Sequence, residues 1–376
     1  MLSDYLHSVT LGDSAKGAYE NRCRLLALPN AYTIPEAVVW EATRRCDMLC
    51  RHCGTPCENA DQASELTTSQ VKDVFGRLDQ AFCLSQVAVV SITGGEPTLR
   101  NDLVEIVDFV RARNVPQVVV HTNGKRCATD SGLLEDLVGA GVTGVGINLD
   151  GVEGNHNWLR RDDRAFRYSL AALSEAKRLG VDTMVSTVLS KRSVADLRPL
   201  RELVMAQAPG RWRLIPLEPI GRANAGEALS PDDMKTVLNF VLETLTEFPG
   251  LTVEMGCGQW YGKKLEGLVR QSIWYCIAGI KVMGILYDGM IGSCNNIDRA
   301  YCQGNALEDD IAAVWKNGFK SFRDRQWCKG GECSECGDWG LCRGGEMHLR
   351  DPRGQRVAPC FYRFLEREMG NAIVSG

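Results

Sequence analysis

The chain has 376 residues, enough for about two domains with a substantial core. Hydrophobic residues at 44% and charged residues at 24% exclude a disordered, collagenous or coiled-coil chain. The net charge of -4 gives no electrostatic reason to expect nucleic acid or an anionic membrane as a partner. The first twenty residues lack the apolar core of a signal peptide, and no run of about 18 apolar residues occurs. We therefore expect a cytoplasmic protein that binds neither nucleic acid nor membrane.

Sixteen cysteines are the most unusual feature of the composition. A chain of this length does not need disulfides to compensate for a small core. In a reducing compartment, clustered thiols are more often metal ligands or catalytic groups. The cysteines therefore need a chemical explanation.

Short β-rich runs alternate with amphipathic helical patterns from residue 37 to residue 250. Strands are expected at 37–42, 87–93, 118–121, 144–149, 183–189 and 213–215. Helices are expected after Thr67 or Thr68 and at 103–110, 131–139, 165–179, 194–207 and 231–247. These six βα units predict an α/β fold with a parallel sheet, either a barrel or an open doubly wound sheet. Ligands would then bind at the carboxyl ends of the strands.

The pattern of the sequence changes beyond about residue 250, where the regular alternation ends, apolar segments are short and glycine is abundant. We therefore divide the chain into an N-terminal extension (1–36), an α/β domain (37–250) and a smaller cysteine-rich domain (251–376) that metal would hold together. Nine of the 16 cysteines fall in this last part: Cys257, Cys276, Cys294, Cys302, Cys328, Cys333, Cys336, Cys342 and Cys360.

Cys46, Cys50 and Cys53 form a Cys-x3-Cys-x2-Cys motif directly after the first expected strand. A parallel α/β fold places its ligand site at this position. A structural zinc site is one interpretation, with Cys57 or His52 as the fourth ligand. Three thiolates on an iron–sulfur cubane would instead leave one iron open, which suits a cluster that binds a further molecule.

The stretch Gly94–Pro97, Gly-Gly-Glu-Pro, ends the second expected strand. Together with the cysteine motif it resembles the radical S-adenosylmethionine (SAM) enzymes. The resemblance implies a partial (β/α)6 TIM-like barrel and a [4Fe-4S] cluster on the three cysteines, whose open iron chelates SAM. Gly94, Gly95 and Glu96 would help to hold SAM. An external donor such as flavodoxin or ferredoxin would reduce the cluster, and SAM cleavage would yield a 5'-deoxyadenosyl radical that abstracts hydrogen from the substrate.

Further matches to this family follow later expected strands. The resemblance implies that Asn148 and Arg160 lie near SAM, although Arg160 is also explained by a simple ion pair on a loop. The matching stretches are Thr122-Asn123-Gly124, Asn148-Leu149-Asp150-Gly151, His156 with Arg160, and Gly221-Arg222.

The C-terminal cysteines resemble the SPASM extension of radical SAM enzymes, which holds auxiliary iron–sulfur clusters. The resemblance covers about residues 276 to 360, but Glu346 stands where the family pattern has a further cysteine after Cys-Arg-Gly-Gly. The cysteines that it assigns to one or two auxiliary clusters are Cys276, Cys294, Cys333, Cys336, Cys342 and Cys360.

The ligands of an inner auxiliary cluster stay open at this point. The resemblance gives Cys333, Cys336, Cys342 and Cys360 to an outer cluster and leaves Cys276 and Cys294 for the inner one. Glu346, Cys257, Cys302 or Cys328 could complete the inner set, or the inner cluster could be open or absent. A single cluster on Cys276, Cys294, Cys333 and Cys336, or one or two zinc sites, are further alternatives.

The resemblance predicts an oxidoreductase or maturase that abstracts hydrogen from an unactivated C–H position. Oxidative modification or cross-linking of a peptide or protein is the first expectation, and a separate protein would then bind the precursor peptide. A dehydrogenase or epimerase of a small molecule, such as an aminoglycoside, a sugar alcohol or a tetrapyrrole, is the second. A non-catalytic zinc or iron–sulfur binding protein is the third. No single catalytic residue is predicted.

Overall fold

The computed structural model describes residues 33–57, 61, 64–270, 275–365 and 367. The expected N-terminal extension lies almost wholly outside these residues. Ten strands form one sheet in the order β10-β9-β8-β1-β2-β3-β4-β5-β6-β7. They are β1 Ala37–Glu41, β2 Val89–Thr93, β3 Gln117–Thr122, β4 Gly144–Asn148, β5 Asp182–Leu189, β6 Arg211–Pro216, β7 Val253–Met255, β8 Val282–Ile285, β9 Met290–Gly292 and β10 Gly304–Asn305.

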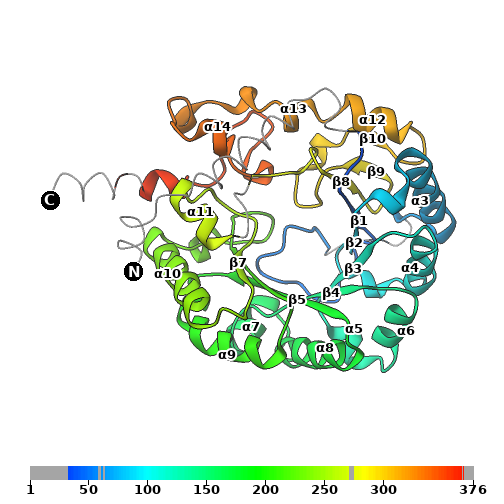
Figure 1. Cartoon of the computed structure of the whole chain (residues 1–376), viewed down its shortest axis with the longest axis horizontal. Coiled ribbons are helices and arrows are strands. Elements are labelled where there is room, and N and C mark those ends of the chain that lie inside the picture. Colours follow the sequence, from blue (N-terminus) through cyan, green and yellow to red (C-terminus); the bar gives the residue numbers. More distant parts are fainter. Residues whose placement is uncertain (1–32, 58–60, 62–63, 271–274, 366, 368–376) are drawn as a thin grey trace.

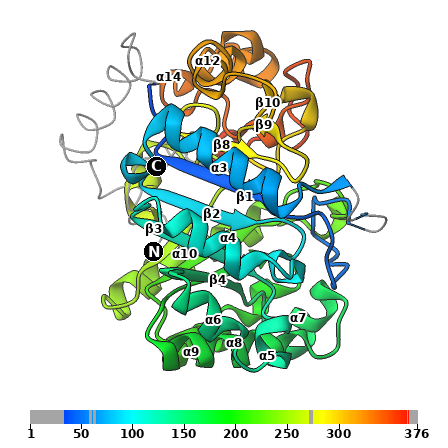
Figure 2. The same ribbon diagram turned by 90° about the vertical axis from the view of Figure 1, so that its right-hand side faces the viewer.

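Strands β1 to β7 are parallel and pair in sequence order, as in a partial barrel. Figure 1 shows the strands as an arc with the helices outside it, and Figure 2 shows α3 and α4 covering one face of the sheet. The α-helices are α3 Thr68–Phe82, α4 Leu103–Arg111, α5 Lys125–Thr129, α6 Leu133–Gly139, α7 Glu153–Arg160, α8 Ala165–Leu179, α9 Leu197–Gln207, α10 Pro231–Glu247, α11 Lys263–Val269, α12 Ile311–Asn317, α13 Lys320–Arg323 and α14 Trp339–Cys342.

Successive side chains of each strand point alternately toward the helices and toward the inner face of the sheet. On β1, Val38 and Trp40 are almost fully buried, and the Trp40 ring contacts Phe75 of α3 with ring centroids 5.7 Å apart. Glu41 follows Trp40, so its side chain is directed to the inner face. The apolar core therefore lies between sheet and helices, and Glu41 is one of the polar residues on the inner face.

All six expected strands are present, and the expected helix 231–247 coincides with α10. Its N-terminus is a capping box. The Ser230 side chain accepts a hydrogen bond from the Asp233 backbone N–H, and the Asp233 side chain accepts one from the Ser230 backbone N–H. The structure adds β7, which pairs with β6 beyond residue 250. Three residues are too few to give a periodic signal, which is why the sequence did not predict this seventh parallel strand.

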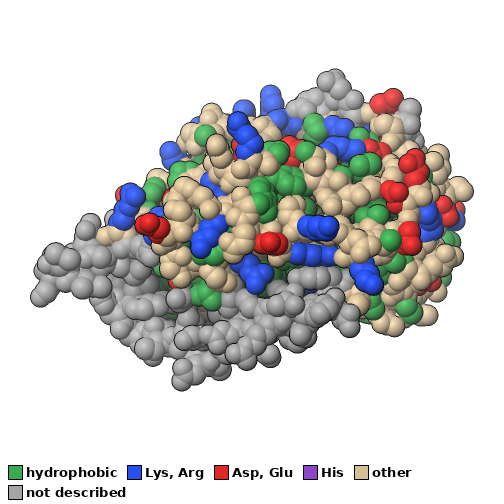
Figure 3. Space-filling view, turned by 90° about the horizontal axis from the view of Figure 1, so that it is seen from above, with side chains coloured by type: hydrophobic (Ala, Val, Ile, Leu, Met, Phe, Trp, Pro, Cys, Tyr) green, Lys and Arg blue, Asp and Glu red, His purple; other side chains and the backbone are tan. Residues whose placement is uncertain are grey.

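The cysteine-rich part of the chain joins the same sheet. Strand β8 pairs in parallel with β1, and β9 and β10 continue the edge in antiparallel pairs. The fully buried rings of Trp315, Phe319 and Phe322 belong to the same hydrophobic core as the parallel strands. Figure 3 views the molecule from the side of this part and shows Lys and Arg side chains scattered among hydrophobic ones.

Candidate active site

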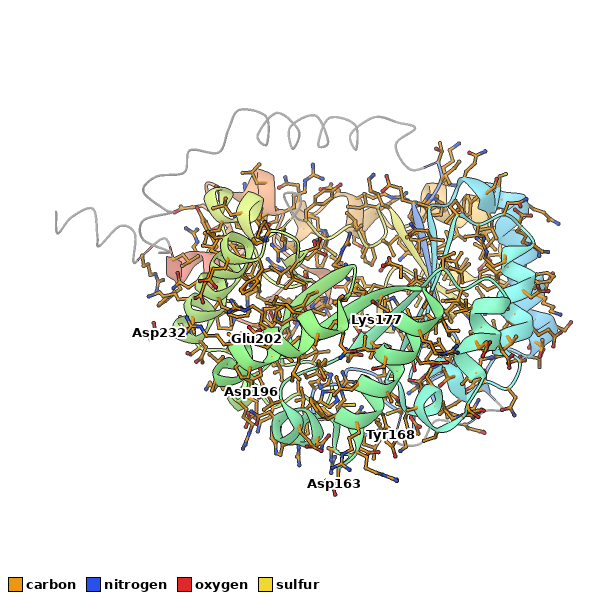
Figure 4. The ribbon with its side chains drawn as sticks, turned by 60° about the horizontal axis from the view of Figure 1, so that its bottom comes forward. Asp163, Tyr168, Lys177, Asp196, Glu202 and Asp232 are labelled. Carbon is orange, nitrogen blue, oxygen red and sulfur yellow. The ribbon has the colours of Figure 1, made fainter. Side chains whose placement is uncertain are left out.

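The cysteine loop, residues 42–57, directly follows β1. In Figure 1 this blue loop lies inside the arc of strands. Cys46 and Cys53 pack against a small buried cluster that contains Cys50 and Tyr168, and Figure 4 labels Tyr168 on α8. The fold thus brings the three predicted cysteines to one place at the carboxyl edge of the sheet.

Gly95, which follows β2, is hydrogen-bonded to this loop. Its N–H donates to the Thr43 carbonyl at 2.7 Å, and the next N–H, that of Glu96, donates to the Arg45 carbonyl at 2.8 Å. A Cβ atom on Gly95 would lie 2.2 Å from the Arg45 oxygen, and one on Gly94 would lie 2.4 Å from the Thr43 oxygen. The two glycines therefore let the backbones approach directly before Cys46.

We expect Gly95→Ala to destabilise the protein by about 2 kcal/mol, because the added methyl group overlaps the Arg45 carbonyl. The displaced loop should also bind less iron at Cys46. Gly76→Ala is the control, since a Cβ atom on this helical glycine meets nothing within 4 Å and should stabilise α3 by about 0.5–1 kcal/mol. Urea unfolding of both variants checks the prediction, and equal midpoints would contradict it.

Glu96 is buried and hydrogen-bonded entirely within the protein. Its Oε1 accepts from the Thr98 backbone at 3.1 Å, from the Thr98 hydroxyl at 2.6 Å and from the Thr122 hydroxyl at 2.8 Å, while Oε2 accepts from the Asn123 backbone at 2.7 Å. Burial raises the pKa of this carboxyl, although each of these hydrogen bonds lowers it. Glu96 therefore joins the end of β2 to the end of β3, and contact with SAM remains a prediction for it.

The Thr-Asn-Gly stretch after β3 also holds the cysteine loop. Asn123 Nδ2 donates to Asp47 Oδ1 at 2.7 Å, and Lys125 Nζ donates to the Asp47 carbonyl at 3.3 Å. Lys125 also pairs with Asp162 at 2.9 Å. Asp47 and Lys125 were not predicted, because nothing in their spacing marks two loop residues as partners.

Arg160 on α7 links the fourth strand to the cysteines. Its Nε donates to Asp150 Oδ2 at 2.6 Å, and its Nη1 lies 3.8 Å from Cys50 Sγ. Burial raises the pKa of Asp150, but Arg160 together with His156 and His52 lowers it to about 2. Asn148, the other residue expected near SAM, is the last residue of β4 and is half-buried.

Asp196, the residue directly before α9, also holds this turn. Its Oδ2 accepts from the Val152 backbone at 3.1 Å and from Asn155 Nδ2 at 2.8 Å. Figure 4 labels Asp196. Asp196 stands about forty residues from this turn in the chain, and such a separation leaves no signal in the sequence.

Gly221 and Arg222, which follow β6, also contact the cysteine loop. Arg222 Nε donates to the Cys50 carbonyl at 3.0 Å and Nη1 donates to the Thr55 carbonyl at 2.8 Å. Gly221 has φ +59°, and a Cβ atom there would lie 2.5 Å from Gly54 Cα. Four strands thus contribute to fixing one cysteine loop.

An iron–sulfur cluster and an anionic ligand fit this loop. Burial raises the pKa of the Cys46 and Cys50 thiols, so a cationic metal group would stabilise their thiolates. Arg160 Nη2 is buried and has no hydrogen-bond partner among the described residues. In the described part of the chain, no three His, Cys, Asp or Glu side chains are close enough to hold one metal ion. Each thiolate of a cubane binds a different iron, so cluster ligands need not approach so closely.

Two family models match the chain: the radical SAM superfamily over residues 40–204, and the SPASM iron–sulfur cluster-binding domain over residues 276–337. A mycofactocin maturase of Mycolicibacterium smegmatis is 30% identical over 325 residues, which are 83% of this chain and 78% of that protein. The chain belongs to the radical SAM superfamily. An AdoMet-dependent heme synthase of Methanosarcina barkeri is 25% identical over 359 residues, 90% of this chain and 99% of that protein.

Solved structures share the fold. SuiB of Streptococcus suis with bound S-adenosylmethionine has a TM-score of 0.67 at 19% identity, covering 84% of this chain and 74% of that one. Native anSMEcpe with bound AdoMet has a TM-score of 0.66 at 18% identity, covering 88% and 94%. The chain is thus a radical SAM enzyme with a SPASM domain, and these domains imply a [4Fe-4S] cluster, SAM and auxiliary iron–sulfur clusters. None of the described helices is long and apolar enough to span a bilayer.

The radical SAM barrel carries ionisable groups on its inner face. Arg213 Nη2 on β6 lies 3.6 Å from Glu254 Oε1 on β7. Burial, together with Arg213, lowers the pKa of His121 on β3 to about 4, which keeps its ring neutral. Burial raises the pKa of Glu41 to about 7. These residues were not predicted as site residues, because a single polar side chain in a strand gives no pattern.

We expect Glu41→Gln to stabilise the apoprotein at pH 8 but not at pH 4.5. A folded-state pKa raised from 4.5 to about 7 means that stability falls as pH rises through this range, by at most about 3 kcal/mol. Arg44, Arg299 and Asp288 also act on this carboxyl. The glutamine cannot ionise, so its advantage over wild type should grow with pH.

Urea unfolding at several pH values measures this growth. Glu202→Gln is the control, since Figure 4 labels Glu202 on α9 and its side chain is 64% exposed. An advantage of Glu41→Gln that does not change with pH would contradict the prediction.

The SPASM domain gathers its cysteines in two places. Cys328, Cys333 and Trp339 form one buried cluster with Cys336 packed against it, and Arg350 Nη2 lies 3.2 Å from Cys333 Sγ. Burial raises the pKa of Cys342 to about 12, with Cys360 and Cys333 close enough to contribute. The four cysteines assigned to the outer cluster therefore lie near one another. Cys276 and Cys294 belong to the second place.

Proposed function

We propose that this enzyme oxidises a C–H position of a peptide or protein, with SPASM clusters as electron acceptors. The main supporting observation is that the SPASM domain joins the sheet that holds the cysteine loop. Its strand β8 pairs directly with β1, and β1 leads into the loop. The similarity to the mycofactocin maturase, at 30% identity over 83% of this chain, supports a peptide substrate. Reduced flavodoxin or ferredoxin would supply the electron for SAM cleavage, and a separate protein would present the precursor.

A cluster held by Cys46, Cys50 and Cys53 would supply, with SAM, the radical chemistry that removes one hydrogen atom from the substrate. Completing a two-electron oxidation requires that the substrate lose one more electron, to the auxiliary site, and one proton. Glu41 faces the inner side of the sheet at the carboxyl end of β1, and its pKa of about 7 allows it to accept a proton near neutrality. Arg160 Nη2 is free to bind an anionic group beside Cys50.

A tetrapyrrole is the second candidate substrate. It is favoured by the match to the AdoMet-dependent heme synthase, which extends over 99% of that protein. The test incubates the reconstituted enzyme anaerobically with SAM, a reductant and either short peptides encoded beside its gene or iron coproporphyrin III. Mass spectrometry follows 5'-deoxyadenosine and the substrate mass.

A peptide that has lost two hydrogen atoms, with matching 5'-deoxyadenosine, supports the proposal. Turnover of the porphyrin with inert peptides would replace it by the second candidate.

A further inference from the structure

The second group of SPASM cysteines contains a thiol and a carboxylate from outside the Cys276–Cys294 pair. Cys257 follows β7, Cys276 precedes β8, Cys294 follows β9, and Glu346 follows α14. These four residues come from separate segments of the fold. Their meeting therefore results from the tertiary structure, not from local spacing.

Hydrogen bonds bring three of these segments together at Glu346. The Gly258 N–H, directly after Cys257, donates to Glu346 Oε1. Arg325 Nη1 donates to the Gly345 carbonyl at 2.8 Å, and its Nη2 donates to the Cys276 carbonyl at 3.4 Å. Cys257 and Cys276 are thus tied to the two sides of the Gly345–Glu346 segment.

Cys294 lies close to the same group. Cys276 and Glu346 are near enough to Cys294 to interact with it electrostatically. Glu346, Cys294 and Cys276 are likewise near enough to interact with Cys257. The four side chains are therefore neighbours in the folded chain.

Three thiols and one carboxylate supply sulfur and oxygen donors of the kinds that iron binds in proteins. The Glu346 side chain is 1% exposed, and its Oε2 lies 2.7 Å from His348 Nε2. This imidazole can orient the carboxylate, as residues beside a metal ligand commonly do. The donor set therefore fits an iron–sulfur cluster.

The other two candidates for this site have different surroundings. Cys302 interacts with Arg299, Asp288 and Glu41. Cys328 packs with Cys333 of the outer group, and its Sγ lies 3.2 Å from the Arg325 carbonyl. Cys302 thus lies among charged groups, and Cys328 belongs to the buried cluster of the outer group.

We propose that Cys257, Cys276, Cys294 and Glu346 together ligate the inner auxiliary iron–sulfur cluster, with one carboxylate in place of a fourth thiolate. A carboxylate is a harder donor than a thiolate, so the iron that it holds should be the most readily exchanged of the cluster. The proposal rests on the auxiliary site of the proposed function and specifies its ligands.

The test uses the full chain with Cys46, Cys50 and Cys53 all replaced by alanine, so that only auxiliary clusters bind iron. Iron and sulfide are counted after anaerobic reconstitution, and EPR spectra of the reduced protein are recorded. Adding Cys257→Ala should remove about four irons, one cluster, while the EPR signal of the outer cluster persists and shows that the variant is folded. Adding Cys302→Ala, the matched control, should remove none.

Glu346→Cys in the same background should keep the iron count and shift the EPR signal of one cluster, because an oxygen ligand becomes sulfur. An unchanged iron count in the Cys257 variant, with an unchanged spectrum in the Glu346 variant, would overturn the ligand assignment. A background protein that binds no iron at all would instead overturn the auxiliary site of the proposed function.

Discussion

Cys50→Ala should abolish reductive cleavage of SAM, with a loss of more than about 100-fold, since changes to residues that only orient a metal ligand already cost about 10- to 100-fold. Cys50 is buried, its carbonyl accepts from Arg222, and Arg160 lies beside its sulfur. Three thiolates are needed to hold a cubane with one open iron, so the variant should lose this cluster and its SAM-dependent EPR change. Formation of 5'-deoxyadenosine under dithionite is the measurement.

Cys57→Ala is the matched control for this prediction. Cys57 is 7% exposed and lies in the same loop, with its Sγ 3.9 Å from the Met48 carbonyl, but outside the motif. It should keep SAM cleavage and lose only about 1 kcal/mol of stability, as a small buried hydrophobe would. If Cys50→Ala cleaved SAM as well as Cys57→Ala does, the assignment of the motif would be wrong.

Cys333→Ala should separate SAM cleavage from product formation. The outer group around Cys333 lies in the SPASM domain, away from the cysteine loop, so 5'-deoxyadenosine should still form within a factor of about three of wild type. Substrate oxidation should fall by more than about tenfold, because the second electron has lost its acceptor. Parallel assays of 5'-deoxyadenosine and oxidised substrate give the ratio of the two.

Cys328→Ala tests whether the loss of substrate oxidation comes from the missing iron–sulfur cluster or from altered packing around Cys333. Cys328 shares the same buried cluster with Cys333 and Trp339, but its thiol donates to the Arg325 carbonyl. Its replacement should leave the two yields coupled. Normal substrate turnover by Cys333→Ala would show that the outer auxiliary site has no catalytic role.

The sequence predicted those parts of the site that follow strands. The cysteine motif, Gly94–Glu96, the stretch at Thr122 and the turn at Asp150 were recognisable because they resemble radical SAM motifs and each lies at the carboxyl end of a β-rich run. Their joint position then follows from the parallel sheet alone. What each residue does was less predictable: Gly95 and Glu96 were expected to hold SAM, and the structure shows that they also brace the cysteine loop.

Contacts between distant segments could not be predicted from the sequence. Asp196 supports a turn some forty residues away, and Arg325 joins Cys276 to Gly345 across the SPASM domain. Such partners have no fixed spacing, since only the folded chain brings them together. For the same reason the sequence left four candidates for the inner ligand set, and our proposal of Cys257 and Glu346 rests on contacts between distant segments.

Iron and sulfide counting with EPR of the reduced wild-type enzyme tests the central claim most directly. After anaerobic reconstitution, we expect about eight to twelve irons with matching sulfide, and SAM should perturb one EPR signal while leaving the auxiliary signals unchanged. Zinc without iron or sulfide, or iron–sulfur signals that SAM leaves unaltered, would contradict the account.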